Sequence, residues 1–149
     1  SGDVDEFIQI ANNTLNNDYS DFFNTWLKKI GFPLLKVVEI YDDNNEIIGI
    51  NITQESYSGA IYQFKISILY EINGELKKID VLMNEKEKDI MVKYDWILVN
   101  DGMESLCAVI YTKVLTEKLH EAKKNEKISY CNKWLIKRSV PLARYIGSD

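Results

Sequence analysis

Few residues in this chain have the type and spacing that catalysis or metal binding requires. His120 is the only histidine in 149 residues, and it opens the run His120-Glu121-Ala122-Lys123-Lys124. The first two residues match the zinc-binding pattern HExxH, in which two histidines one helical turn apart hold the ion. Lys124 occupies the second ligand position, and its ammonium group has no lone pair to give to a metal. We therefore expect no metal site in this chain and interpret the run as the solvated face of a helix.

Acidic and thiol side chains offer two further candidates. Asp42-Asp43 could act in acid–base chemistry or bind calcium, but the pair lacks the ligand spacing of a calcium loop, and we interpret it as a hairpin tip. Cys107 and Cys131 lie among apolar residues without a CxxC spacing, so we interpret them as buried free thiols. Free thiols favour the cytoplasm, a location that the sequence otherwise leaves open. We expect no catalytic, cofactor-binding or metal-binding residue in this chain.

Charge and hydropathy restrict the partners. The 18 basic and 23 acidic residues are spread along the chain and give a net charge of −5, so no basic face is available for nucleic-acid phosphates. Apolar runs such as Trp96–Val99 and Cys107–Ile110 are far shorter than the ~20 residues that cross a bilayer. We expect neither nucleic acid nor a membrane as a partner. The start at Ser1-Gly2, without Met or a leader, favours a piece cut from a longer protein.

Two helices are predicted at the start of the chain. Apolar residues at helical spacing predict the first over residues 4–16. The second is predicted over residues 18–30, with Asp18 as its N-cap. Gly31 and Pro33 end it, because glycine adopts the left-handed conformation that closes a helix and proline cannot continue one.

Beyond Pro33 the apolar period changes from 3.6 to 2, which is typical of half-buried antiparallel strands. The clearest alternation runs from Tyr62 to Ile72, with polar side chains such as Ser67 and Glu71 on the opposite face. Asp42–Asn45 and Asn73-Gly74 supply hairpin turns. Strands are predicted over residues 34–41, 46–54, 60–72, 75–83, 87–93, 96–99 and 105–111.

The spacing of these strands predicts a mainly β fold with flanking helices, an antiparallel β-sandwich of about seven strands. A helix is predicted over residues 112–124, with Val114, Leu115 and Leu119 on its apolar side. A further helix is predicted over residues 128–146, interrupted by Pro141.

Residues 23–33 read F-x-x-W-x-x-x-x-G-F-P, with Trp26, Gly31, Phe32 and Pro33 as its later members. This run resembles one in aminopeptidase N-like (gluzincin) zinc aminopeptidases, in which a similar helix ends the catalytic domain and leads into the first strand of a small β-sandwich. The resemblance implies that Trp26 is a buried apolar anchor, Gly31 the helix stop and Pro33 a rigid entry into the strand.

Residues 96–111 are similar to the W-I-x-x-N-x-G and V-x-Y runs that close the family's sandwich. The matching positions are Trp96, Asn100, Gly102, Val109 and Tyr111. Within this stretch, Gly-Met-Glu-Ser resembles the G-x-M-E-N run with which some aminopeptidases hold the free amine of a substrate. One residue is missing and serine replaces asparagine, so we interpret it as a turn between two strands.

The resemblance divides the chain into three segments. Residues 1–32 would end the catalytic domain, residues 33–111 would form the sandwich domain, and residues 112–149 would begin the C-terminal helical domain. The last assignment depends on Asn132-Lys133-Trp134-Leu135-Ile136, which is similar to the family's D-R-W-x-I run. Zinc is then expected in the parent protein and not in this chain.

The implied function belongs to the parent, a zinc-dependent aminopeptidase that removes N-terminal residues from peptides. This chain would be its non-catalytic spacer, with the missing catalytic and C-terminal helical domains as partners and with self-association through the terminal helices. The alternative is a non-catalytic aminopeptidase-like module for protein interaction, as in a transcription initiation factor subunit. An HExxH motif in the longer protein would distinguish the two.

Overall fold

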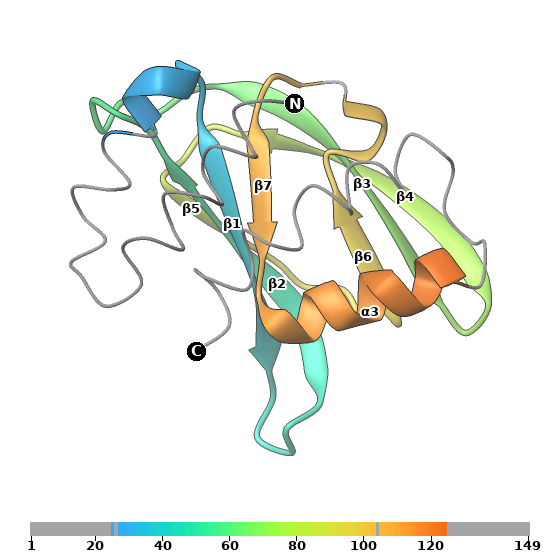
Figure 1. The fold of residues 1–149 in the computed structure, drawn as a ribbon. Helices are drawn as coiled ribbons and strands as arrows, with labels where there is room; N and C mark the ends of the chain where they lie inside the picture. Colours follow the sequence, from blue (N-terminus) through green and yellow to red (C-terminus); the bar gives the residue numbers. More distant parts are fainter. Residues whose placement is uncertain (1–24, 26, 104, 125–149) are drawn as a thin grey trace.

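The fold is mainly β and consists of two sheets. A computed structural model describes residues 25, 27–103 and 105–124 (Figure 1). The described elements are β1 (Leu34–Tyr41), β2 (Ile47–Glu55), β3 (Phe64–Ile72), β4 (Glu75–Met83), β5 (Glu87–Ile90), β6 (Trp96–Val99), the 3-10 helix η1 (Asp101–Met103), β7 (Ala108–Tyr111) and α3 (Lys113–Lys124).

The two sheets have four and three strands, in the orders β5-β2-β1-β7 and β4-β3-β6. Alternate residues of both sheets point into one shared core. Ile50 and Ile52 enter it from β2, and Ile66 and Ile68 enter it from β3, all with no exposed surface. The arrangement is therefore similar to a β-sandwich, as the strand pattern predicts.

The predicted hairpin turns are confirmed. Asn45 closes the β1–β2 turn with φ 60°, and the β3–β4 turn has φ 52° at Asn73 and φ 80° at Gly74. Two consecutive residues with positive φ match the right-handed twist of the flanking strands, and asparagine followed by glycine tolerates that conformation best. β3 and β4 consequently pair over their whole length without a register shift.

The prediction of a wholly antiparallel sandwich is wrong at one strand pair. β7 pairs with β1 in parallel, from Leu34 opposite Ala108 to Val37 opposite Tyr111. The connection after β6 returns the chain to the beginning of β1, where the Ala108 N–H donates to the carbonyl of Pro33 at 3.1 Å. β7 must then run in the same direction as β1.

The predicted strand over residues 60–72 begins too early, since β3 starts at Phe64. The Gln54 side chain binds both main-chain polar groups of Tyr62, which are therefore not available to a strand. Ser67 and Glu71, predicted on an exposed polar face, are 3% and 7% exposed. Their face of β3 is covered because η1 packs against β3 and α3 crosses the neighbouring β6 (Figure 1).

Helix positions also differ from the prediction. Residues 101–103 form η1 where a plain turn was expected. α3 begins at Lys113, since Thr112 caps it, and Val114 is 37% exposed instead of lying on the buried side. A helical stretch ends at Ile30, where Gly31 has φ 71° as predicted. The predicted helices over 4–16 and 128–146, and most of that over 18–30, lie outside the described residues.

Candidate functional site

The closing run of the sandwich joins the two sheets through one hydroxyl group. Tyr111 ends β7 and is 2% exposed. Its Oη accepts a hydrogen bond from the Val99 N–H at 3.0 Å and donates to the Val99 carbonyl at 3.4 Å. Val99 ends β6 in the opposite sheet. A buried hydroxyl with both functions satisfied is stable in a core, so this contact connects the sheets without an unpaired polar atom.

Burial raises the pKa of the Tyr111 phenol, while the hydrogen bond from the Val99 N–H acts in the opposite direction. Burial also dominates at Tyr94, whose hydroxyl donates to the Gly49 carbonyl at 3.0 Å and whose pKa is raised further by the charge of Glu39. Both phenols are therefore neutral and structural at physiological pH.

Asn100 determines the shape of the connection between β6 and β7. The residue is 1% exposed and has φ 63°. Its Nδ2 donates to the Ser105 carbonyl at 2.9 Å, and its Oδ1 accepts from the Ser105 N–H at 3.1 Å. Gly102 follows with φ 75°, a conformation that glycine adopts without steric cost. The asparagine and the glycine of the run thus close a turn, and both polar atoms of the Asn100 amide are used within it.

The apolar members of the run are core residues. Trp96 is 3% exposed and Val109 is 5% exposed, and both belong to the buried apolar cluster. The indole Nε1 of Trp96 is buried and has no acceptor among the described residues. A buried donor left unpaired costs about 1–3 kcal/mol, so the packing of the ring has to offset that cost.

The junction run lies directly beside the closing run. Pro33 is buried and Phe32 half-buried where the chain enters β1. The Pro33 carbonyl binds the Ala108 N–H at the start of β7, so two runs about 70 residues apart meet at one end of a sheet. Trp26, the predicted anchor of the junction, lies outside the described residues.

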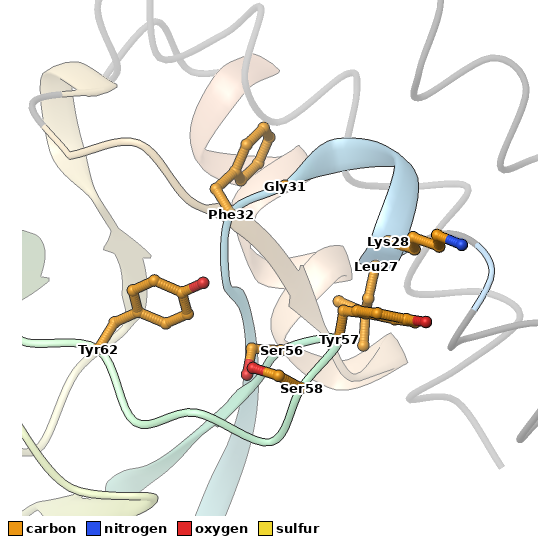
Figure 2. A pocket seen from close by; sticks show the side chains of 8 residues that line it. All are labelled: Leu27, Lys28, Gly31, Phe32, Ser56, Tyr57, Ser58 and Tyr62. Carbon is orange, nitrogen blue, oxygen red and sulfur yellow. The ribbon is translucent and has the colours of Figure 1, made fainter.

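A pocket of about 150 Å³ adjoins this junction (Figure 2). Its lining comes from the end of the helix and the segment after β2: Leu27, Lys28, Gly31, Phe32, Ser56, Tyr57, Ser58 and Tyr62. The Lys28 ammonium lies 5.6 Å from the centroid of the Tyr57 ring, within range of a cation–π interaction. The strand prediction missed this pocket because it placed Tyr62 in β3.

The polar groups of the pocket serve its own loop. Ser56 Oγ donates to the Ala60 carbonyl at 2.8 Å, and Ser58 Oγ accepts from the Ala60 N–H at 3.3 Å. The volume is below the ~300 Å³ at which ligand pockets usually begin. The pocket therefore shows no activated nucleophile, and it is smaller than the pockets that usually hold a drug-sized ligand.

The remaining candidates have structural roles. Asp42 Oδ1 accepts from the N–H groups of Asn44 and Glu46 at 2.8 and 2.9 Å, which confirms the hairpin tip. Cys107 is a free, half-buried thiol, and burial raises its pKa to about 12, so it is not a thiolate near neutral pH. His120 is half-buried on α3, not fully solvated as predicted, whereas Lys124 is exposed. Cys131 lies outside the described residues.

Metal ligands do not cluster in the part of the chain that the structure describes. No three side chains of histidine, cysteine, aspartate or glutamate lie close enough together there to hold an ion. These residues do not fit the zinc ion of the family that the two runs resemble, so we assign no reaction step to one here. Among the same residues, no helix is long and apolar enough to cross a membrane.

The sequence analysis did not single out Gln54, whose side chain connects the end of β2 to the main chain at Tyr62 and at Glu85. It is 1% exposed, exchanges two hydrogen bonds with the main chain of Tyr62, and donates to the Glu85 carbonyl at 2.8 Å. A signal exists in the sequence, because Gln54 continues the inward-facing series of Ile50 and Ile52. An amide at such a position is buried and has to find partners.

Comparisons with protein-family models and with curated proteins find no match for this chain.

Proposed function

We propose that this chain is the non-catalytic β-sandwich segment of a zinc-dependent aminopeptidase of the aminopeptidase N-like family. In the parent protein the catalytic domain would remove N-terminal residues from peptides. The sandwich would act as scaffold and spacer between that domain and a C-terminal helical domain.

The meeting of the two family-like runs carries this proposal. They are far apart in the sequence, yet the Pro33 carbonyl binds the Ala108 N–H at 3.1 Å and the β1–β7 ladder continues from that contact. Tyr111, the last residue of the second run, then joins β7 to Val99 in the other sheet. The two runs therefore lie together in the fold, and this supports the proposal that both belong to one sandwich domain of the family type.

The contacts of the matched residues favour a scaffold role for this chain rather than a substrate-binding role. Trp96, Val109 and Tyr111 are almost fully buried, and Asn100 uses its amide within its own turn. Apart from the Trp96 indole N–H, the polar side-chain groups of these residues are satisfied within the described fold, which is typical of residues that stabilise a core. Most of the described residues in the run over residues 96–111 thus have a structural role.

The test begins with the coding sequence upstream of Ser1. An HExxH motif followed by a glutamate about twenty residues later would provide the ligands of a zinc peptidase. The longer protein, expressed intact, should then contain zinc and hydrolyse aminoacyl p-nitroanilides. Replacing the motif glutamate should abolish the activity while zinc stays bound, which serves as the control.

The Tyr111→Phe variant of the longer protein separates scaffold from site. A scaffold role predicts a lower melting temperature with an unchanged KM for the small substrate, whereas a direct role in binding would change KM. A longer protein that has the surrounding helical domains but lacks HExxH and activity would favour the interaction module, as in a transcription initiation factor subunit. A longer protein with neither would contradict both functions.

A further inference from the structure

β4 is a long edge strand. It pairs with β3 on one side, and no described strand pairs with its other side. Its nine residues pair with β3 on one side without a register shift, and it is the outermost strand of its sheet. The other outer strands, β5, β6 and β7, have four residues each. Edge strands expose main-chain N–H and C=O groups that can pair with another strand. β4 contains no proline or bulge to prevent such pairing, and the Leu82 carbonyl, which accepts from Lys88 Nζ at 2.7 Å, has a second lone pair for a partner strand.

The outward face of β4 is apolar at both ends and charged in the middle. Leu76 and Leu82 are 56% and 49% exposed, and Lys78 and Asp80 lie between them on the same face. On the neighbouring β3, Ser67 and Glu71 are buried on that face. Two of the three exposed leucines among the described residues therefore lie on β4, and the third, Leu106, lies in the connection before β7.

We propose that a second copy of this chain pairs with β4, strand against strand and antiparallel, about a two-fold axis at Ile79. An axis perpendicular to the sheet keeps both cores on the same side and places each residue opposite its symmetry mate. Leu76 then faces Leu82 of the other copy, and Lys78 faces Asp80, each contact occurring twice. All nine residues of β4 gain a cross-strand neighbour, and the two three-stranded sheets become one continuous sheet.

The charges select this register. Moving the axis by one residue toward Lys78 places Lys78 opposite itself, and moving it toward Asp80 places Asp80 opposite itself. Like charges directly opposite each other on antiparallel strands are destabilising. The order Leu-x-Lys-x-Asp-x-Leu is thus complementary to its own reverse only when Ile79 lies on the axis.

Existing contacts hold the two charged groups over the outward face. Lys78 Nζ lies 2.9 Å from Asp101 Oδ2, and Asp80 Oδ1 accepts from Ser67 Oγ at 2.8 Å. An ammonium has three donors and a carboxylate has two oxygens, so both groups retain capacity for a partner across the strand. The inner-face pair Lys77 and Glu75 is exposed, with 3.7 Å between Nζ and Oε2, and a flexible lysine can keep its charge in water.

Sedimentation velocity over a concentration series tests the proposal on the full chain. We expect a reversible monomer–dimer equilibrium. Lys78→Glu places two acidic side chains opposite each other and should weaken dimerisation about tenfold or more, and Asp80→Lys should do the same. The double variant Lys78→Glu with Asp80→Lys restores opposite charges across the strand and should recover the dimer. Thermal unfolding of each variant checks that loss of the Asp101 and Ser67 contacts leaves the fold intact.

Lys113→Glu is the matched control, because it makes the same change in net charge at an exposed residue of α3. It should leave the dimer dissociation constant unchanged within about twofold. Dimers that respond equally to Lys113→Glu and Lys78→Glu would reflect overall charge and would overturn the assigned contact.

Cysteine cross-linking tests the register independently. A mixture of Leu76→Cys and Leu82→Cys proteins should form an intermolecular disulfide, since the two positions face each other. With Cys107 and Cys131 replaced by serine, either variant alone should not, because like positions lie about 20 Å apart along the strands. A chain that stays monomeric up to its solubility limit would overturn the proposal. So would a dimer that withstands charge reversal and whose cross-linking is no greater in the mixture. Neither outcome depends on the aminopeptidase assignment.

Discussion

Gly49 of β2 lies so close to β5 that a Cβ on this residue would stand 2.5 Å from the carbonyl oxygen of Ile90. The contact is with main chain, which cannot move aside as a flexible side chain can. We expect Gly49→Ala to destabilise the fold by roughly 1–3 kcal/mol, as overpacking does. Urea unfolding followed by tryptophan fluorescence measures the loss.

Gly59→Ala is the control for that experiment. Gly59 has open space around its Cα but a φ of 77°, so alanine there meets only the backbone penalty of about 1 kcal/mol. If Gly49→Ala cost less than Gly59→Ala, the close approach of β2 and β5 would be wrong.

Tyr111→Phe removes the hydroxyl that joins the two sheets and leaves the buried Val99 N–H without this acceptor. We expect a loss of about 1–3 kcal/mol in unfolding free energy. Tyr57→Phe, at a residue that is 53% exposed, should change stability by less than about 0.5 kcal/mol. Equal effects in denaturant titrations would refute the structural role of the Tyr111 hydroxyl.

Gln54→Leu keeps the volume of a buried side chain but removes all its hydrogen bonds to Tyr62 and Glu85. The main-chain groups of Tyr62 then lose their partners, and the loop over residues 56–62 should open. We expect faster amide hydrogen exchange in this loop and at residues 84–86, with β3 and β4 unaffected. Ser58→Ala perturbs the same loop through one weaker contact and is the comparison. Unchanged exchange at Tyr62 in Gln54→Leu would contradict the assigned role.

Alkaline pH should destabilise the protein in two stages. Burial raises the pKa of Cys107 to about 12 and raises the pKa values of Tyr94 and Tyr111 above the ordinary value. The unfolded chain therefore releases these protons first, so stability present below the unfolded pKa is lost as pH rises. The decline should begin near pH 9 through Cys107 and steepen above about pH 10 through the tyrosines.

The measurement is the unfolding free energy between pH 7 and pH 11. A fully buried group such as Tyr111 contributes a slope of about 1.4 kcal/mol per pH unit once the unfolded phenol ionises. Cys107→Ser should make the curve less steep from about pH 9 up to pH 11 and leave the tyrosine contribution above about pH 10. A stability that stays constant up to pH 11 would show that these groups titrate equally in both states.

The purified chain should bind no zinc at one equivalent and hydrolyse no aminoacyl p-nitroanilide, because its single histidine has no partner ligand at the required spacing. Isothermal titration calorimetry and a leucine p-nitroanilide assay test this, with a zinc aminopeptidase as the positive control. Stoichiometric zinc binding at micromolar or tighter affinity would disprove it.

Local signals explain which elements the sequence predicts well. β1, β4 and β6 have the predicted bounds, because alternating or continuous apolar residues end there at strong turn signals such as Asn73-Gly74. The positive φ of Gly31 is likewise predicted by the sequence, because a glycine that ends a helix shortly before a proline typically adopts the left-handed conformation.

Long-range contacts explain what the sequence could not predict. Periodicity assigns Tyr62 to a strand, but the Gln54 side chain, eight residues earlier, forms hydrogen bonds with the main-chain N–H and carbonyl of Tyr62. The parallel β1–β7 pair is invisible to local pattern, because its partners are far apart and strand direction follows from the intervening fold. The burial of Ser67 and Glu71 has the same origin, since residues after position 100 cover them. The prediction that Trp26 anchors the junction still requires a test.

The parallel pairing of β1 and β7 has a mechanical consequence. The chain enters this pair before Leu34 at one end and leaves it after Tyr111 at the other, roughly 10 Å further along the strands. In an antiparallel pair, entry and exit would share one end, and a pull between the flanking segments would break the ladder one bond at a time. Here tension between those segments acts along the strands and loads the ladder bonds together, in shear. A sandwich connected in this way resists extension and transmits force between whatever is attached before Pro33 and after Thr112.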